Sequence, residues 1–193
     1  RWRVILDTLV LHNFGPYEGR NVIELTPPSR DRPVILIGAM NGGGKTSFLQ
    51  ALHLVLYGKR ARSLAYGTGG YDAYLRDRIH DQSAAEDGAS ICLTFRHWRD
   101  GRPEQLSVRR SWVVRGKAVR ESVDVLRDGT FDQLLTEHWD ERVEEFLPRG
   151  LAHLFFFDAE NIAAIVTDGS TREVLRTGVL GLLGLDLVDQ LDT

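Results

Sequence analysis

The stretch IGAMNGGGKTSFLQAL (residues 37–52) limits most strongly what this chain can fold into. It places a glycine-rich loop between an apolar run, RPVILIG (32–38), and a densely apolar segment that follows Lys45. A short β-branched run that stops at glycine is typical of a buried central strand. Apolar residues on nearly every side of the next segment predict a buried helix that ends at Gly58. The sequence therefore predicts a strand–loop–helix unit.

The loop of this unit has the composition that a nucleoside triphosphate requires. Glycines allow positive φ and close approach of backbone N–H groups, and a helix N-terminus favours anions. We expect Lys45 to reach the β- and γ-phosphates and the Thr46 hydroxyl to ligate Mg²⁺. The alternative is a glycine-rich turn before a core helix, with Lys45 solvated. The predicted ATP-binding residues are Gly38, Asn41, Gly42, Gly43, Gly44, Lys45, Thr46 and Ser47.

The loop departs from the usual phosphate-binding pattern at one position. The spacing G-x-x-x-x-G-K-[ST] puts its first glycine at position 39, where this chain has Ala39, and Gly38 lies one residue earlier. Alanine costs little where φ is negative, so we expect a local adjustment of the backbone and retained binding.

A pair of carboxylates follows a second apolar run, LFFFDAE (154–160). As a Walker B motif, Asp158 would hold Mg²⁺ through water and Glu160 would activate the attacking water. The acids of such motifs are normally adjacent, whereas Ala159 separates them here. They could instead cap a helix that begins near Asn161. Lys45, Asp158 and Glu160 are the candidate catalytic residues.

The rest of the chain predicts an antiparallel β lobe attached to a nucleotide core. Residues 3–25 read as two strands joined by a Gly/Pro turn, and alternating segments between 89 and 129 read as further strands. Residues 59–88 predict a surface excursion with a short helix. Residues 132–148 predict one amphipathic helix ended by a proline. With 152–157 as a second core strand, the fold class is α/β, with parallel core strands and an antiparallel lobe.

Charge and cysteine content narrow the function. A net charge of −3 gives no general basic field, so nucleic-acid binding would need a local patch. Basic residues gather on the predicted lobe and after the phosphate-loop helix, as solvated faces or as contacts to a DNA backbone. The single cysteine excludes an internal disulfide and indicates a reducing cytoplasm, and no segment is long and apolar enough to predict a membrane span. The candidate DNA contacts are Arg60, Arg62, Arg109, Arg115 and Lys117.

Two aromatic residues near the chain start, Phe14 and Tyr17, could flank an adenine or pack in the core or the turn.

Three segments together resemble the N-terminal half of the head of an SMC-like ABC ATPase: LDTLVLHNFGPYEGRNVIEL (6–25), GAMNGGGKTSFLQALHLVLYG (38–58) and HLFFFDAENI (153–162). Within that superfamily the chain is most similar to the DndD family of DNA sulfur modification ATPases, above all over residues 136–162. The corresponding family segment usually reads F-F-F-D-G-E, so Ala159 stands where a glycine is usual.

This resemblance implies a head split into two halves by a long coiled coil. The N-terminal half carries the phosphate loop and a Q-loop, and the C-terminal half carries the signature, Walker B and switch histidine. Asp158 then falls at the Q-loop position, where it would contact Mg²⁺ and the attacking water. Residues 1–170 would be the N-terminal part of the head, and 171–193 the start of the coiled-coil helix of a longer, cytoplasmic protein.

The function that the resemblance implies is ATP hydrolysis that drives head association and DNA remodelling in DNA phosphorothioation. The ATPase would be inactive without its C-terminal half. Its expected partners are that half, a second copy of the head, other DNA sulfur modification proteins and DNA. Three alternatives remain open: an SMC-type repair or recombination ATPase, a nucleotide-gated scaffold with little turnover, and a self-contained NTPase that uses Asp158 and Glu160.

Overall fold

The structure is a computed structural model of the 193-residue chain. It describes residues 4–29, 31, 35, 37–38, 40, 42–61, 68–99, 101–149 and 152. The chain divides into two compact units, Arg1–Phe146 and Leu147–Thr193. All the helices and strands described below belong to the first unit.

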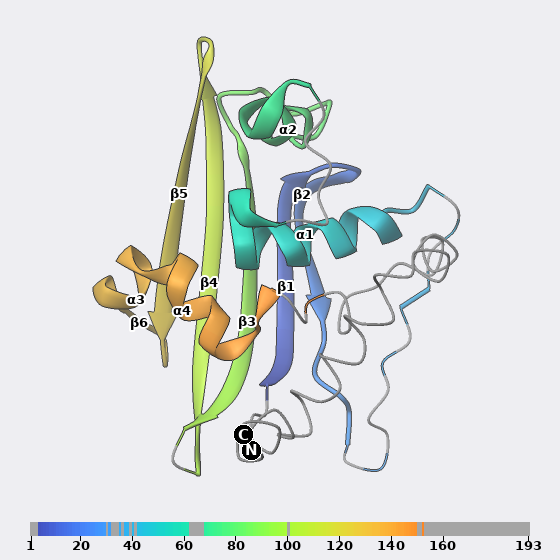
Figure 1. The fold of residues 1–193 in the computed structure, drawn as a ribbon. Helices are drawn as coiled ribbons and strands as arrows, with labels where there is room; N and C mark the ends of the chain where they lie inside the picture. The colour runs from blue at the N-terminus through green and yellow to red at the C-terminus, as the bar shows by residue number, and fades with distance from the viewer. Residues whose placement is uncertain are drawn as a thin grey trace, which may run out of the picture. The chain divides into compact units, whose positions relative to one another are not determined.

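The first unit is built on a six-stranded sheet in the order β2-β1-β3-β4-β5-β6, in which every neighbouring pair is antiparallel (Figure 1). The predicted strands at the chain start and the predicted lobe are therefore one continuous sheet, because β1 pairs with β3. The strands are β1 (Val4–Phe14), β2 (Tyr17–Glu24), β3 (Ala89–Arg99), β4 (Arg102–Arg115), β5 (Ala118–Arg127) and β6 (Thr130–Phe131).

One face of this sheet forms the hydrophobic core. Side chains alternate between the two faces along a strand, and alternate residues in the middle of β3 and β4 are buried. Leu93 of β3 pairs with Leu9 on one side and with Val108 on the other, and all three are 0% exposed. The residues that alternate with these core positions lie on the opposite face, where Arg109 is exposed and its neighbours are half-buried.

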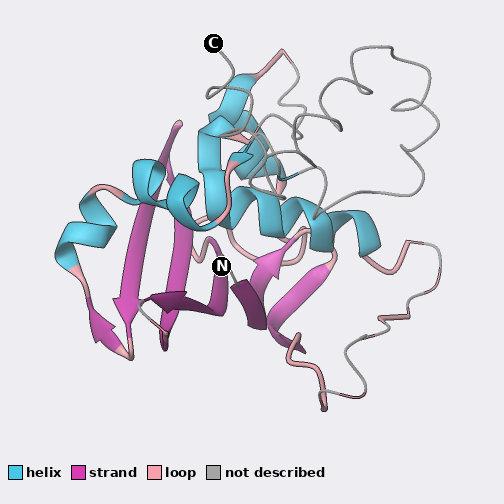
Figure 2. Cartoon of the chain, turned by 60° about the horizontal axis from the view of Figure 1, so that its bottom comes forward, coloured by secondary structure: helices cyan, strands magenta, loops and turns pink. Residues whose placement is uncertain are grey.

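The helices pack on the buried face of the sheet, as Figure 2 shows from the side. They are α1 (Lys45–Tyr57), the 3₁₀ turn η1 (Gly58–Arg60), α2 (Gly70–Asp77), α3 (Gln133–Glu137) and α4 (Trp139–Phe146). The predicted helix after the glycine-rich loop is confirmed with its end at Gly58, whose φ of 50° lies in the region that glycine adopts most readily. Its residues 51–57 are all buried.

The prediction of a single helix over residues 132–148 was wrong. The segment forms α3 and α4 with a break at His138, whose φ of −111° and ψ of 18° are not helical. The break lets the Trp139 side chain enter the core, where its indole N–H donates to the Leu56 carbonyl oxygen at 3.0 Å. The predicted apolar face is confirmed at Leu135, Trp139 and Val143, which are buried.

The predicted parallel core is not shown. Of the proposed strand at 32–38, the structure describes residues 35, 37 and 38, and none of them is in a strand. The proposed strand at 152–157 lies outside the described residues except for Ala152, and the proposed coiled-coil start at 171–193 lies outside them entirely. In the described part of the chain, no helix has the length and apolar character needed to cross a membrane.

Candidate nucleotide site

The glycine-rich loop meets the start of α1 at Gly44. Gly44 has φ 87° and ψ 10°, the left-handed conformation, and it precedes Lys45 directly. The first hydrogen bond of the helix runs from Phe48 N to Gly44 O at 2.8 Å. The capping residue is glycine, so no side chain caps the N–H groups at the start of the helix. The N–H groups of Thr46 and Ser47 therefore have no acceptor within the helix, which gives this end of α1 the donors and the dipole that favour an anion.

The loop before the helix folds back on the carbonyl oxygen of Met40. Gly43 N donates to this oxygen at 2.9 Å, and Lys45 Nζ donates to it at 3.2 Å. Gly42 has φ 81°, a backbone conformation that is unfavourable for residues with a side chain. The ammonium group of Lys45, which is predicted to bind phosphate, thus lies against the backbone of this loop.

Residues 42–47 of the predicted phosphate site therefore lie around one helix start. Gly38 is exposed and its φ is not in the left-handed region. Ala39 and Asn41 lie outside the described residues. The effect of alanine at position 39 on the loop stays a prediction.

The turn between β1 and β2 lies against the loop. Tyr17 Oη donates to Gly44 O at 3.0 Å, and a Cβ at Gly44 would lie 2.7 Å from the same hydroxyl. A Cβ at Gly15 would lie 3.4 Å from Ser47 Oγ. Burial raises the pKa of Tyr17 above its ordinary value, so its hydroxyl keeps its proton as a donor over the physiological pH range.

The two aromatic residues proposed to flank an adenine have different positions. Phe14 is 0% exposed and packs edge-on against Trp112, with 6.0 Å between ring centroids, so it is a core residue. Tyr17 contacts the backbone of the phosphate loop. The sequence signal for this contact is the glycine content of the two segments, because glycines in a turn and in a loop allow their backbones to approach closely.

The turn before Tyr17, the first residue of β2, is itself held in place. Gly15 N donates to Arg78 O at 2.8 Å, and His80 Nδ1 lies 2.7 Å from Gly15 O. Asn13, at φ 48°, accepts a hydrogen bond from Gly19 N at 2.9 Å through its side-chain oxygen. Tyr17 therefore extends from a turn with hydrogen bonds on several sides.

The C-terminal end of α1 is held by Trp139 and by a buried cation. Arg110 is 4% exposed, and its Nη1 lies 2.7 Å from Glu121 Oε1. Its guanidinium lies over Gly58, where a Cβ would approach Nη1 to 2.5 Å. Arg110 lies on the core face with Leu106, Val108 and Trp112, because side chains alternate between the two faces along β4.

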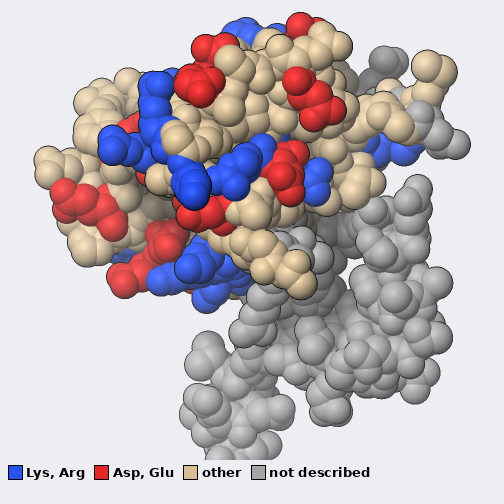
Figure 3. Space-filling model, turned by 90° about the horizontal axis from the view of Figure 1, so that it is seen from above, with Lys and Arg blue, Asp and Glu red and all other residues tan. Residues whose placement is uncertain are grey.

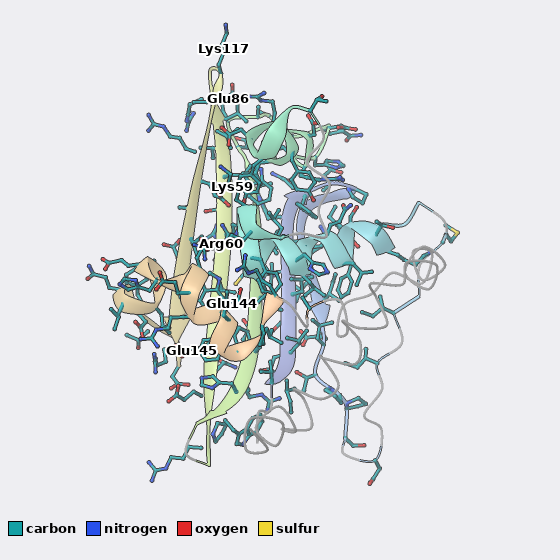
Figure 4. The ribbon with its side chains drawn as sticks, in the orientation of Figure 1. Lys59, Arg60, Glu86, Lys117, Glu144 and Glu145 are labelled. Carbon is teal, nitrogen blue, oxygen red and sulfur yellow. The ribbon has the colours of Figure 1, made fainter. Side chains whose placement is uncertain are left out.

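The candidate DNA contacts that the structure describes lie on different elements. Arg109 lies on the outer face of the sheet between Cys92 and Asp124, and Arg115 is exposed at the end of β4. Lys117 is at the tip of the β4–β5 hairpin and points away from the sheet (Figure 4). Arg60 donates to Asp140 O at 3.1 Å and lies 3.6 Å from the Asp140 carboxylate. Arg62 lies outside the described residues.

On the face that Figure 3 shows, Lys and Arg side chains alternate with Asp and Glu side chains. This face therefore does not carry a field of one sign. On this face, contacts to a DNA backbone would come from individual side chains.

The carboxylates Asp158 and Glu160 lie outside the described residues, so the Walker B, Q-loop and helix-cap interpretations stay predictions. Within the described part, no three His, Cys, Asp or Glu residues lie close enough together to hold a metal ion. The hydroxyl of Thr46, exposed at the start of α1, is the described group that the phosphate-loop pattern assigns to Mg²⁺.

Comparisons with known proteins agree with a nucleotide-binding site. A family model described as "AAA domain" matches residues 8–172, well over half of the chain. The chain is also similar to a component of the nuclease SbcCD from Vibrio cholerae serotype O1, with 42% identity over 55 residues. That match covers 28% of this chain and 5% of the relative, so the chain spans only a small part of that relative's length.

Proposed function

The chain belongs to the AAA domain family, and on this basis we propose that it is the ATP-binding half of an SMC-like ATPase head that acts on DNA. The observation that carries the proposal is the start of α1. The helix is preceded by Gly44 in the left-handed conformation, which provides no side-chain cap, and it begins at Lys45. This arrangement suits a polyphosphate, because backbone donors, a helix dipole and a lysine converge on one place.

Each residue of the loop has a distinct role in this proposal. The N–H groups at the start of α1 bind the β-phosphate, and Lys45 exchanges the Met40 carbonyl oxygen for phosphate oxygens. Thr46 holds Mg²⁺, which supplies positive charge between the β- and γ-phosphates. Asn41 and Ser47 add phosphate contacts at either side of this set.

Turnover in this proposal needs residues from more than one part of the head. Asp158 acts at the Q-loop position on Mg²⁺ and the attacking water, with Glu160 nearby. The signature and the catalytic carboxylate come from the C-terminal half and from a second copy of the head. ATP is bound between two heads, and its hydrolysis separates them.

The DNA reaction that we propose for the full protein is phosphorothioation, in which a sulfur replaces a non-bridging backbone oxygen. The support is the resemblance over residues 136–162 to the DndD family. The ATPase supplies conformational work on DNA, and separate sulfur modification proteins carry out the sulfur chemistry in the cytoplasm.

The first test is ATP binding and turnover by the purified chain and its variants. Lys45→Ala is expected to abolish Mg·ATP binding, while Lys59→Ala, at the other end of the helix, keeps it. Hydrolysis is expected to be negligible until the C-terminal half of the head is added. Unaided turnover that Asp158→Ala removes would instead identify residues 154–160 as a Walker B motif and would contradict the split-head proposal.

A second experiment tests the reaction in cells. DNA from cells that carry Lys45→Ala in the full-length protein is digested and analysed for phosphorothioate linkages by mass spectrometry. We expect the linkages to disappear while the protein level stays unchanged. Linkages at the wild-type level would rule out phosphorothioation as the function.

A repair or recombination ATPase of the SMC type is the second candidate, favoured by the 55-residue match to the component of nuclease SbcCD. It predicts that Lys45→Ala sensitises cells to DNA breaks and leaves phosphorothioates unchanged. A nucleotide-gated scaffold is the third candidate. It predicts ATP-dependent association of the full protein with no turnover.

A further inference from the structure

Tyr17 lies outside the phosphate-binding pattern, yet it contacts the loop at the residue before Lys45. Its hydroxyl donates to Gly44 O at 3.0 Å, from a turn that is 27 residues away in sequence. We propose that Tyr17 is a positioning residue of the phosphate loop, which sets the orientation of the Gly44–Lys45 peptide for binding phosphate. This inference rests on the proposed function, because it assumes that the loop binds ATP.

The oxygen of Gly44 accepts two hydrogen bonds that fix the plane of its peptide. One comes from Phe48 N at 2.8 Å and the other from Tyr17 Oη at 3.0 Å, and a carbonyl oxygen has lone pairs for both. A trans peptide is planar, so its C=O and the following N–H point in opposite directions. Holding the Gly44 oxygen on the Tyr17 side therefore turns the Lys45 N–H to the side opposite Tyr17.

The ring of Tyr17 supports the same geometry by shape. A Cβ at Gly44 would lie 2.9 Å from Tyr17 Cζ and 3.0 Å from Cε2, so the ring leaves no room for a side chain at this position. With φ at 87°, Gly44 occupies a conformation that other residues rarely adopt. The ring and the hydroxyl together favour the single loop conformation in which α1 starts at Lys45.

Tyr17 can act in this way because its own position is fixed. It pairs with Phe14 across the β1–β2 turn, and Phe14 is 0% exposed in the core. The intervening Gly15 is hydrogen-bonded to residues 78–80 through both its N–H and its carbonyl oxygen. A donor held by a rigid turn loses little freedom when the loop binds a ligand, so its orientation of the loop favours binding.

This role differs from that of an aromatic residue stacked on a nucleotide base. A stacking ring acts on the base and is retained when tyrosine is replaced by phenylalanine. A hydroxyl that orients the backbone beside the phosphates acts on the polyphosphate alone. The two roles therefore predict opposite behaviour for Tyr17→Phe and for a ligand that has no base.

The experiment measures binding of Mg·ATP and of Mg·tripolyphosphate to wild type, Tyr17→Phe and Tyr71→Phe. Tyr71 is the matched control, because its hydroxyl also donates one hydrogen bond, to Glu121 Oε1 at 2.6 Å. Neither Tyr71 nor Glu121 belongs to the phosphate loop. Both ligands are measured by displacement of a fluorescent ATP analogue. We expect Tyr17→Phe to weaken both by the same factor, about five-fold, as the loss of one hydrogen bond gives. Without ligand, the melting temperature of Tyr17→Phe should differ from that of wild type by no more than that of Tyr71→Phe does.

Three results would overturn the inference, and they can be told apart. Wild-type affinity of Tyr17→Phe for both ligands would show that the hydroxyl does not orient the loop. Weaker ATP binding with unchanged tripolyphosphate binding would show that the hydroxyl contacts the nucleoside part of ATP and does not orient the phosphate loop. Wild-type protein that binds ATP no better than Lys45→Ala would refute the proposed function itself, and the inference with it.

Discussion

Trp139 donates its indole N–H to the carbonyl oxygen of Leu56 at 3.0 Å, so a residue of α4 holds the last turn of the helix that begins at the phosphate loop. Both partners are buried, with Trp139 2% exposed and Leu56 0% exposed. At the other end of the same helix, Tyr17 contacts Gly44. Helix α1 is thus fixed at both ends by residues distant in sequence.

Trp139→Phe should therefore destabilise the fold by about 2 kcal/mol, because it leaves the Leu56 oxygen without its donor and opens space in the core. Urea denaturation of both proteins measures the difference. Leu134→Ala on α3, which is 61% exposed, is the control and should change stability by less than about 0.5 kcal/mol. Equal stability of Trp139→Phe and wild type would show that this contact does not hold α1.

Arg110 and Glu121 give an asymmetric prediction. The pair is 2.7 Å apart, but Nε and Nη2 of the buried guanidinium have no hydrogen-bond partner among the described residues. Glu121→Gln leaves the buried cation without its counter-charge and should cost roughly 2 kcal/mol or more. Arg110→Met removes the buried charge together with its two unpaired donors, so it should cost less stability than Glu121→Gln. Chemical denaturation of both variants tests this order, and a larger loss for Arg110→Met would contradict it.

The elements built from local patterns were predictable from the sequence. Helix α1, strands β1 to β5 and the Gly/Pro turn follow from apolar periodicity, β-branched runs and glycine positions, each of which is read within about ten residues. The glycine-rich loop before α1 was predictable for the same reason, since its residues are consecutive, whereas its binding of phosphate stays a prediction. These features need no knowledge of the rest of the chain.

The features that the sequence did not predict depend on contacts between distant residues. The break at His138 directly precedes Trp139, which hydrogen-bonds to Leu56, 83 residues away. The contacts of Arg110 with Gly58 and Glu121 depend on how the end of α1 and strand β5 pack against β4. The position of Tyr17 depends on how the β1–β2 turn packs against the loop. Propensity does not encode such contacts, because tertiary packing decides them.

Gly44→Ala should abolish ATP binding and cost about 1–2 kcal/mol of stability. The new Cβ would lie 2.7 Å from the Tyr17 hydroxyl, at a φ of 87° that disfavours a side chain. Gly101→Ala, in the β3–β4 hairpin, is the matched control that should keep ATP binding, since Gly101 has a similar φ of 80° but its Cβ would meet no described atom within 4 Å. Thermal unfolding and ATP titration measure both effects, and retained ATP binding by Gly44→Ala would contradict the proposed loop geometry.

Asp132 gives a pH-dependent prediction. Its Oδ1 accepts from Leu135 N at 2.9 Å at the start of α3, and this bond, with Arg127 beside it, lowers the pKa of the carboxyl below its usual range. A lowered pKa means that the folded state binds the proton less readily. The stabilisation is therefore present at neutral pH and is lost as the pH falls through the folded-state pKa.

Asp132→Ala should consequently cost about 1 kcal/mol at pH 7, the usual value for a lost helix cap, and progressively less below about pH 4. Urea midpoints of the two proteins, measured from about pH 7 to about pH 3, test this. A difference that stays constant across the whole range would show that the ionised carboxylate is not what stabilises the cap.

Lys117 provides the sharpest test of DNA contact, because it points away from the sheet at the hairpin tip (Figure 4). If the full-length protein contacts the DNA backbone there, Lys117→Ala should weaken binding equally for all DNA sequences. It should also reduce the slope of log affinity against log salt by about one. Arg142→Ala is the control, since Arg142 pairs with Glu145 at 2.5 Å on α4 and should leave the slope unchanged. An unchanged slope for Lys117→Ala would remove the hairpin tip from the DNA path, because a phosphate contact cannot be lost without losing its counterion release.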